Sequence, residues 1–267
     1  MPPSPEPLPY RSEFLIRWFV WYVRRYQLRP AFTAVRLACD GNPQPLPPGA
    51  PLVVALNHAS WWDPLICVVP MDMFPGRRHF APIDAAMLEK YGLFKKLGFF
   101  GVEQGSARGA ARFLKTSQAI LAQPDTALWI TAQGTFADVR TRPVVLRPGL
   151  GHLLHRQPGV HVLPLAMEYT FWNEKRPEVL LRFGTPVVST GREQSAEYWT
   201  NQVASALTEA LDQLATAAQS RDPGRFRTLW TGTRGISGVY DAWRRLTHRF
   251  RGQRFEPGHA PEPADSE

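Results

Sequence analysis

A histidine and an aspartate five positions apart form the pair in this sequence whose chemistry is easiest to specify. His58 and Asp63 lie in the segment PLVVALNHASWWDPL, residues 51–65. A carboxylate that accepts a hydrogen bond from one imidazole nitrogen fixes the tautomer and leaves the other nitrogen free to take a proton. A histidine held in this way can deprotonate a hydroxyl, which then attacks an acyl carbonyl. Such general-base help contributes typically ~100- to 10,000-fold to a rate.

The backbone around this pair must bend for the two side chains to meet. The apolar run Leu52 to Leu56 predicts a buried strand. Pro64 suits the first turn of a helix, so we expect a helix from Pro64 to about Val69 with Asp63 as its N-cap. On one straight helix residues five apart would diverge by about 140°, but across a tight turn they can meet. The alternative is that the spacing arises by chance and Asp63 is a cap and nothing more.

The elements expected around this turn are those of an α/β fold. Apolar strand-like runs alternate with helical patterns, which predicts a single domain with a mostly parallel central sheet flanked by helices. Such folds bind ligands at the carboxyl ends of their strands, where His58 lies. Four segments are expected: a disordered leader at 1–9, an N-terminal membrane-interface helical segment at 10–40, the α/β domain at 41–220, and a basic C-terminal helix and tail at 221–267.

Composition favours an anionic and lipid-like environment. The formal net charge of +8 favours anionic partners, and nine Trp and fifteen Phe suit a bilayer interface. No nucleic-acid-binding motif is found, so nucleic acid is not an expected partner. The apolar helix expected from Tyr10 to Leu28 is either a core helix or one lying in a membrane interface, and its aromatic residues and flanking arginines favour the interface. Its longest apolar run is too short and too charged to cross a bilayer. For the C-terminal helix, at about 239–250, contact with a membrane and a solvated surface are equally open.

Further motifs give the pair a family context. The pattern N-H-x-x-x-x-D after a short strand resembles the first motif of the glycerolipid acyltransferases, whose best-known members acylate lysophosphatidic acid. Three segments resemble the later motifs in the family's order: GVEQ at 101–104, TAQGTF at 131–136 and VLPLA at 162–166. Together the motifs cover roughly residues 50–190.

The resemblance implies both a location and a reaction. It implies acyl-CoA or acyl-carrier protein as co-substrate, no further cofactor, a lipid hydroxyl as acceptor, His58 as general base and Asp63 as its partner. It also implies a peripheral or monotopic protein on the cytoplasmic face of a membrane. The alternative is a non-catalytic lipid- or membrane-binding protein on the same scaffold. The altered third motif favours that alternative, and the intact pair of His58 and Asp63 argues against it.

The departures from the family pattern concern the acceptor. The family usually has Arg where this chain has Gln104 and Phe136, and Glu where it has Gln133. An amide or a phenyl ring cannot form the bidentate hydrogen bonds that a guanidinium donates to a phosphate. The acceptor is therefore either a phosphorylated lipid held by other arginines or a neutral hydroxyl such as that of a sugar. The candidate substrate-binding residues are Asn57, Glu103, Gln104, Arg108, Gln133, Gly134, Thr135, Arg140 and Arg142.

Several of these candidates also have plainer interpretations. Arg140 and Arg142 are at least as well explained as ordinary loop charges. Gly134 either brings backbone N–H groups to an anionic oxygen or makes a tight turn without a ligand. His152 and His155 have helical spacing, but no recognised third metal ligand accompanies them, so no metal site is expected. Cys67 lies in an apolar run and is expected to be a buried packing residue.

Overall fold

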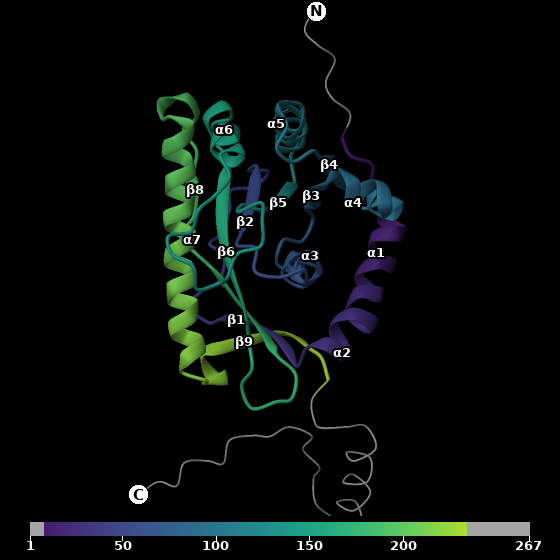
Figure 1. Cartoon of the computed structure of the whole chain (residues 1–267), viewed down its shortest axis with the longest axis vertical. Coiled ribbons are helices and arrows are strands. Elements are labelled where there is room, and N and C mark those ends of the chain that lie inside the picture. The colour runs from purple at the N-terminus through teal and green to yellow at the C-terminus, as the bar shows by residue number, and fades with distance from the viewer. Residues whose placement is uncertain (1–7, 234–267) are drawn as a thin grey trace, which may run out of the picture.

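The computed structural model describes residues 8–233, which form one mixed sheet with helices around it (Figure 1). The strand order is β4-β3-β5-β2-β6-β7-β1-β9, and the short β8 also pairs with β6. The bounds are β1 Ala34–Ala38, β2 Leu52–Leu56, β3 Arg78–Asp84, β4 Phe99–Val102, β5 Thr126–Thr131, β6 His161–Thr170, β7 Glu178–Phe183, β8 Val187–Val188 and β9 Phe226–Thr231.

Most strand pairs are parallel, which confirms the predicted fold class. β2 runs parallel to both β5 and β6, β3 to both β4 and β5, and β1 to β7. The antiparallel pairs join β1 to β9 and β6 to β7 and β8. Every residue of β2 is buried, because this central strand is covered on both faces. Burial on both faces is why it reads as a continuous apolar run rather than an alternating one.

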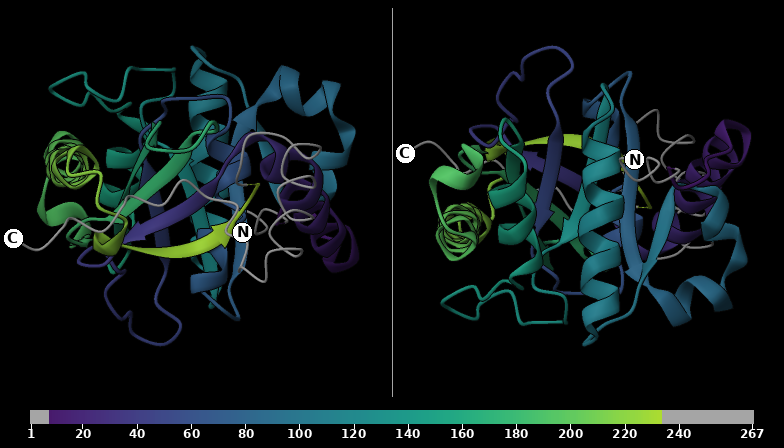
Figure 2. Two further views of the ribbon diagram at one scale, coloured as in Figure 1. Left: turned by 90° about the horizontal axis from the view of Figure 1, so that it is seen from below. Right: turned by 90° about the horizontal axis from the view of Figure 1, so that it is seen from above.

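Two groups of helices cover the two faces of the sheet. The core on one face contains residues of α5 (Ala107–Leu121), α6 (Gly149–Arg156) and α7 (Ala196–Gln219). The core on the other face contains residues of α3 (Asp63–Ile66) and of the helix that follows α1 (Glu13–Tyr22). Figures 1 and 2 show α7 at one side of the molecule and α1 at the other. β2 alternates between the cores, with Val53 and Ala55 in the first and Leu52, Val54 and Leu56 in the second.

The N-terminal helix is longer than the prediction at its carboxyl end. α1 continues through a π-helical turn, Val23–Leu28, into α2, Arg29–Ala31. Among residues 8–233, no helix is long and apolar enough to span a membrane. The C-terminal helix expected at about 239–250 lies outside the described residues.

The sheet extends past both domain boundaries expected from the sequence. β1 comes from the segment 10–40, which was expected to be a helical membrane element, and β9 comes from the segment 221–267. Neighbouring strands far apart in the sequence hold them in place. β1 pairs with β7, and the buried Arg36 guanidinium bonds Glu178 of β7 and Thr228 of β9.

Two helices end earlier than predicted, for backbone reasons. The helix expected from Pro64 to Val69 is the single turn α3, followed by a 3₁₀ turn over Pro70–Met73. Proline lacks the N–H that a continuing helix needs. The sequence pattern over 85–97 also predicts a helix, and the structure has α4, Ala85–Lys90, followed by a 3₁₀ turn that begins at Gly92. Glycine carries a large conformational-entropy penalty inside a helix.

Candidate active site

His58 and Asp63 meet across the turn that follows β2. His58 Nδ1 lies 2.7 Å from Asp63 Oδ2. The Asp63 side chain is completely buried, and the His58 side chain is 17% exposed. The carboxylate therefore faces the protein interior and the imidazole reaches toward solvent. This is the geometry that orients an imidazole and leaves its Nε2 free to exchange a proton.

Two further donors hold the Asp63 carboxylate. The Ser60 backbone N–H donates to Oδ2 at 3.0 Å, and the Tyr169 hydroxyl donates to Oδ1 at 2.6 Å. A buried charge is costly unless it is hydrogen-bonded, and here both carboxylate oxygens are bonded. The predicted role of Asp63 as the N-cap of α3 is wrong. Asp63 is the first residue of the helix, and its carboxylate is occupied by His58, Ser60 and Tyr169 instead of the first-turn N–H groups.

Tyr169 is a site residue that the sequence analysis missed. Burial and the nearby Asp63 carboxylate both raise the pKa of its hydroxyl, so it remains a protonated donor. Tyr169 lies near the end of β6, and Leu56 pairs with Leu165 in the register of β2 and β6. Only this register brings a residue 106 positions away in the sequence to Asp63. No local pattern in the sequence could have revealed that contact.

The loop after β5 braces the His58 backbone. The His58 N–H donates to Gln133 Oε1 at 2.7 Å, and the His58 carbonyl accepts from Ala137 N at 2.8 Å. Gln133 stands where the family usually has Glu, and its amide oxygen supplies the acceptor that this N–H requires. The altered third motif therefore still performs a positioning task.

Asn57 is also a brace. Its side-chain amide donates to the Met167 carbonyl and accepts from the Met167 N–H, both at 2.9 Å. The residue is 2% exposed, so its side chain ties β2 to β6 instead of facing a substrate. Asn57 and Gln133 were expected to bind substrate, and the structure gives both a bonding role inside the protein.

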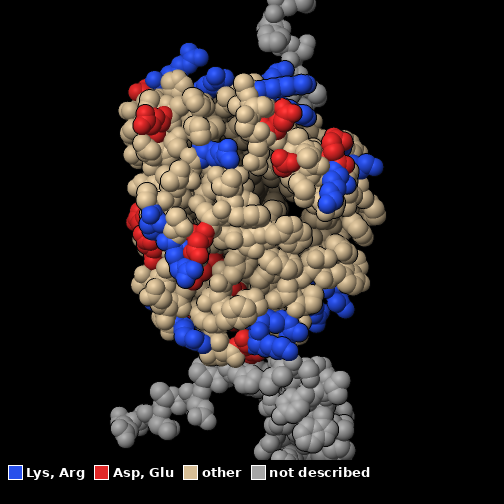
Figure 3. Space-filling view, viewed as in Figure 1, with Lys and Arg blue, Asp and Glu red and all other residues tan. Residues whose placement is uncertain are grey.

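The exposed side of the imidazole is lined by an aromatic ring. The Phe136 ring centroid lies 4.4 Å from that of His58, and Phe136 is 62% exposed. Trp61, in the turn between His58 and Asp63, is 61% exposed. No described residue bonds His58 Nε2. Figure 3 shows a hollow on this face, close to the position of α3 in Figure 1, with a broad uncharged surface below it. An apolar surface beside a reactive imidazole suits a lipid-like substrate.

Gly134 serves as a tight turn. Its φ is +68°, a conformation that favours glycine, and its N–H donates to the Thr131 carbonyl at 3.0 Å. That N–H is therefore not free for an anionic oxygen. A Cβ at position 134 would lie 2.7 Å from Arg147 Nε. The glycine thus allows Arg147 to lie against the third motif. The Arg147 side chain is exposed and has no ion-pair partner within residues 8–233. Thr135, the next residue of the motif, is exposed.

Two of the three arginines named from the sequence, Arg140 and Arg142, are engaged elsewhere. Arg140 donates bidentate hydrogen bonds to the Asp138 carboxylate, at 2.9 and 2.7 Å. Arg142 bonds Asp212 of α7 at 2.8 Å. Both charges are paired within the protein, which favours their interpretation as loop charges. Arg147, which the sequence analysis did not select, is the unpaired cation beside the motif.

The second motif lies at the same edge of the sheet but farther from His58. Glu103 and Gln104 follow β4, and Glu103 accepts a hydrogen bond from Ser106 Oγ at 2.9 Å. Arg108 is exposed in the first turn of α5. β4 is three positions from β2 in the sheet, about 14 Å at the usual strand spacing. These three residues do not contact His58, although a long acceptor could reach both places.

Residues with other possible chemistry have structural roles. Cys67 is buried, as predicted, and its burial raises the pKa of its thiol, so it is not a ready nucleophile. Among the residues that the structure describes, no group of three or more His, Cys, Asp or Glu side chains could hold a metal ion. Phe32 packs against both Trp62 and Tyr169 and so supports the Tyr169 ring.

Comparisons with known proteins find similarity to acyltransferases in sequence and in fold. A family model described as Acyltransferase matches residues 38–168, the region that contains His58, Asp63, the third motif and most of β6. The crystal structure of the 1-acyl-sn-glycerophosphate (LPA) acyltransferase PlsC from Thermotoga maritima shares the fold, with a TM-score of 0.50 and 14% sequence identity. The match covers 76% of this chain and 80% of that one. No curated protein matches the sequence. Over residues 38–168 the chain is similar to the acyltransferase family, and it shares the fold of PlsC.

Proposed function

We propose that this enzyme transfers a fatty acyl group from acyl-CoA or acyl-carrier protein to a hydroxyl of a lysophospholipid or related lipid or glycolipid acceptor, with His58 as general base. The observation that carries the proposal is the 2.7 Å contact between His58 Nδ1 and the buried Asp63 carboxylate, with Nε2 unbonded by any described residue and the Phe136 ring beside the imidazole. A histidine that served only to stabilise the fold would not need a free nitrogen at the surface.

The proposed reaction requires no covalent enzyme intermediate. His58 Nε2 takes the proton from the acceptor hydroxyl as its oxygen attacks the thioester carbonyl. Asp63 stabilises the imidazolium that forms. The tetrahedral intermediate collapses by breaking the C–S bond, and the thiolate that leaves takes the proton from His58. The products are an ester and a free thiol, and the histidine returns to its starting state.

Arg147 is the residue we propose to recognise an acceptor phosphate. Phe136 occupies the place where the family usually has Arg, and Arg140 and Arg142 are paired elsewhere. Arg147 lies against Gly134 in the same loop without an ion-pair partner among the described residues. A neutral hydroxyl is the competing acceptor class, because Phe136 covers His58 with an uncharged ring.

We also propose that α1 docks the enzyme on the cytoplasmic face of a membrane. Phe14, Trp18 and Trp21 are 69%, 42% and 53% exposed and recur at helical spacing along one face. Exposed aromatic side chains on one helical face, flanked by arginines, are typical of an interfacial helix. Sedimentation with anionic vesicles tests this proposal. Trp18→Ser/Trp21→Ser should bind roughly tenfold more weakly, while Val188→Ser/Tyr198→Ser, which removes two exposed apolar side chains at β8 and α7, should bind like the parent.

Thiol release tests the catalytic proposal. Purified protein is mixed with acyl-CoA or acyl-carrier protein and with acceptors that do or do not carry a phosphate, and the ester product is identified by mass spectrometry. Thiol release should require an acceptor and should fall ~100- to 10,000-fold in His58→Ala. His161→Ala, a histidine change at the start of β6 and away from the site, should remain active. Binding of lipid with no ester formed under any pairing would support the non-catalytic alternative.

A further inference from the structure

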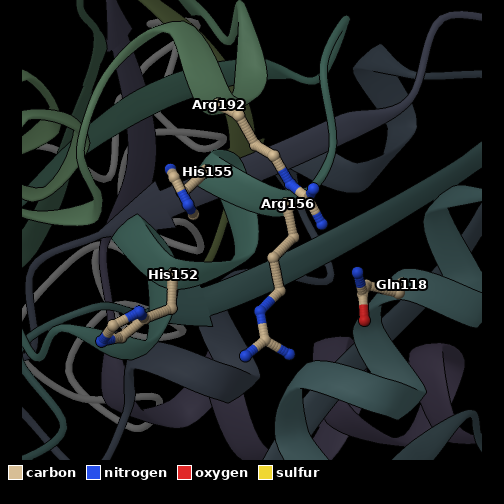
Figure 4. Close-up of a pocket in the computed structure, with 5 residues that line it drawn as sticks. All are labelled: Gln118, His152, His155, Arg156 and Arg192. Atoms are coloured by element: carbon tan, nitrogen blue, oxygen red, sulfur yellow. The ribbon is translucent and has the colours of Figure 1, made fainter.

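A second, basic pocket lies at the opposite edge of the sheet from His58. It is open to solvent, has a volume of about 550 Å³, and is lined by Gln118, His152, His155, Arg156 and Arg192. Figure 4 shows these side chains around one space, with contributions from α5, from α6 and from the 3₁₀ turn Gly191–Glu193. The volume falls within the usual range for small-molecule sites.

The sheet register separates this pocket from the catalytic site. α6 ends at Arg156, just before the start of β6 at His161, and His161 pairs with Leu52 at the start of β2. His58 lies six residues beyond Leu52, which corresponds to about 20 Å along the strand. The pocket residues lie on the face of the sheet that α5, α6 and α7 cover, whereas His58 and Asp63 lie on the α3 side. A ligand confined to this pocket therefore does not touch the reacting groups.

No acidic residue among residues 8–233 neutralises the charge in the pocket. Neither Arg156 nor Arg192 has a hydrogen-bond or ion-pair partner within residues 8–233, in contrast to Arg140, Arg142 and Arg182, which each bond a carboxylate. His155 Nδ1 donates to the Gln194 carbonyl at 2.8 Å, which fixes its ring at the pocket wall. No acidic side chain lines the pocket. Two unpaired guanidinium groups in one concavity attract an anion strongly.

The arrangement of the two guanidinium groups indicates what kind of anion fits. In Figure 4 they lie apart from each other, with the Gln118 amide facing the pocket from α5 and His152 on the other side of Arg156. Two separated cationic centres suit two anionic centres better than one. A guanidinium matches a phosphate with two parallel hydrogen bonds.

We propose that this pocket binds a soluble organic diphosphate. Arg156 and Arg192 each hold one phosphate group, and Gln118 supplies a neutral donor. Two sources share this chemistry: a free nucleoside diphosphate, and the phosphorylated adenosine portion of coenzyme A. α1 lies on the far side of the molecule, so the pocket stays open to solvent in the proposed membrane-docked orientation (Figure 1). The proposal does not depend on the catalytic role of His58.

Calorimetric titration of the full-length protein tests the proposal, with ADP, coenzyme A, inorganic pyrophosphate and adenosine as probes. ADP and pyrophosphate should bind and adenosine should not. Arg156→Gln/Arg192→Gln should lose at least about tenfold in ADP affinity, and Arg192→Gln alone should lose part of it. Arg225→Gln/Arg227→Gln, which removes the same charge at the start of β9 and in the turn before it, should bind ADP within about twofold of the parent.

His58→Ala should bind ADP as the parent does, so a failed catalytic proposal would leave this result unchanged. Binding of ADP while acyl-CoA saturates the enzyme would identify a free nucleotide as the ligand, and competition between the two would identify coenzyme A. Three results would overturn the proposal: no binding of any diphosphate, equal binding by Arg156→Gln/Arg192→Gln and parent, or an equal loss in the β9 variant.

Discussion

The turn after β2 and the loop after β5 meet at His58, but they differ in how their side chains are held. In the turn, the Asp63 carboxylate is buried and bonded by three groups, and every one of these contacts serves to orient the imidazole. In the loop, the Gln133 side chain and the Ala137 backbone N–H brace the turn, while Phe136 and Val145 are 62% and 71% exposed. The family pattern is intact in the turn and altered in the loop.

This difference separates reactivity from selectivity. A proton transfer needs a fixed geometry, so changes in the turn should reduce the rate for every acceptor. Phe136 is the exposed loop side chain that lies beside His58, so a change there should alter which acceptors the enzyme prefers. Four substitutions test that separation.

Asp63→Asn should give the largest change. The amide keeps the shape of the side chain but removes the charge that stabilises the imidazolium, so kcat should fall by on the order of 1,000-fold for all acceptors. Asp212→Asn, which alters an exposed carboxylate on α7, should leave kcat within about twofold. A loss confined to one acceptor class would show that the turn also selects substrates.

Tyr169→Phe should give an intermediate loss. It removes the hydroxyl that donates to Asp63 Oδ1 and should reduce kcat roughly tenfold, with little change in KM, because Tyr169 acts through Asp63. Tyr198→Phe on α7 is the matched control and should be silent. If Tyr169→Phe raised KM alone, Tyr169 would contact the acceptor instead of positioning the carboxylate.

Phe136→Arg should change the acceptor preference. A guanidinium in place of the ring should raise kcat/KM for phosphorylated over neutral acceptors by several-fold. Val145→Arg adds the same charge at another exposed position of the loop and should shift the ratio less. Equal shifts in both variants would show that the effect comes from general electrostatic attraction to the added charge.

Gln133→Glu should give the smallest change. A carboxylate oxygen can accept the same hydrogen bond from the His58 N–H, so activity should stay within about threefold of the parent. Gln133→Ala leaves that N–H without its acceptor and should lower the thermal midpoint and the rate together. If Gln133→Glu were as damaging as Gln133→Ala, the amide group itself would have a role beyond this contact.

Local sequence predicted the strand before His58 and the meeting of His58 with Asp63, because strand, turn and proline all lie within fifteen residues. It did not predict how the Asp63 oxygens are shared, since competition among Ser60, Tyr169 and the helix N-terminus depends on tertiary contacts. The pairing of Arg142 with Asp212 and the proximity of Arg147 to Gly134 depend in the same way on how the loop folds back. Strands β1 and β9 were not predicted, because the strands with which they pair lie far away in the sequence.

A double-mutant cycle on acyl transfer, with His58→Ala, Asp63→Asn and the combined variant, measures whether the two residues act as one unit. Groups that act as one unit are strongly non-additive. We therefore predict that adding Asp63→Asn to His58→Ala causes no further loss of rate, while all three proteins keep the parent's fold by circular dichroism. Losses that multiply, or a His58→Ala protein as active as the parent, would contradict the account.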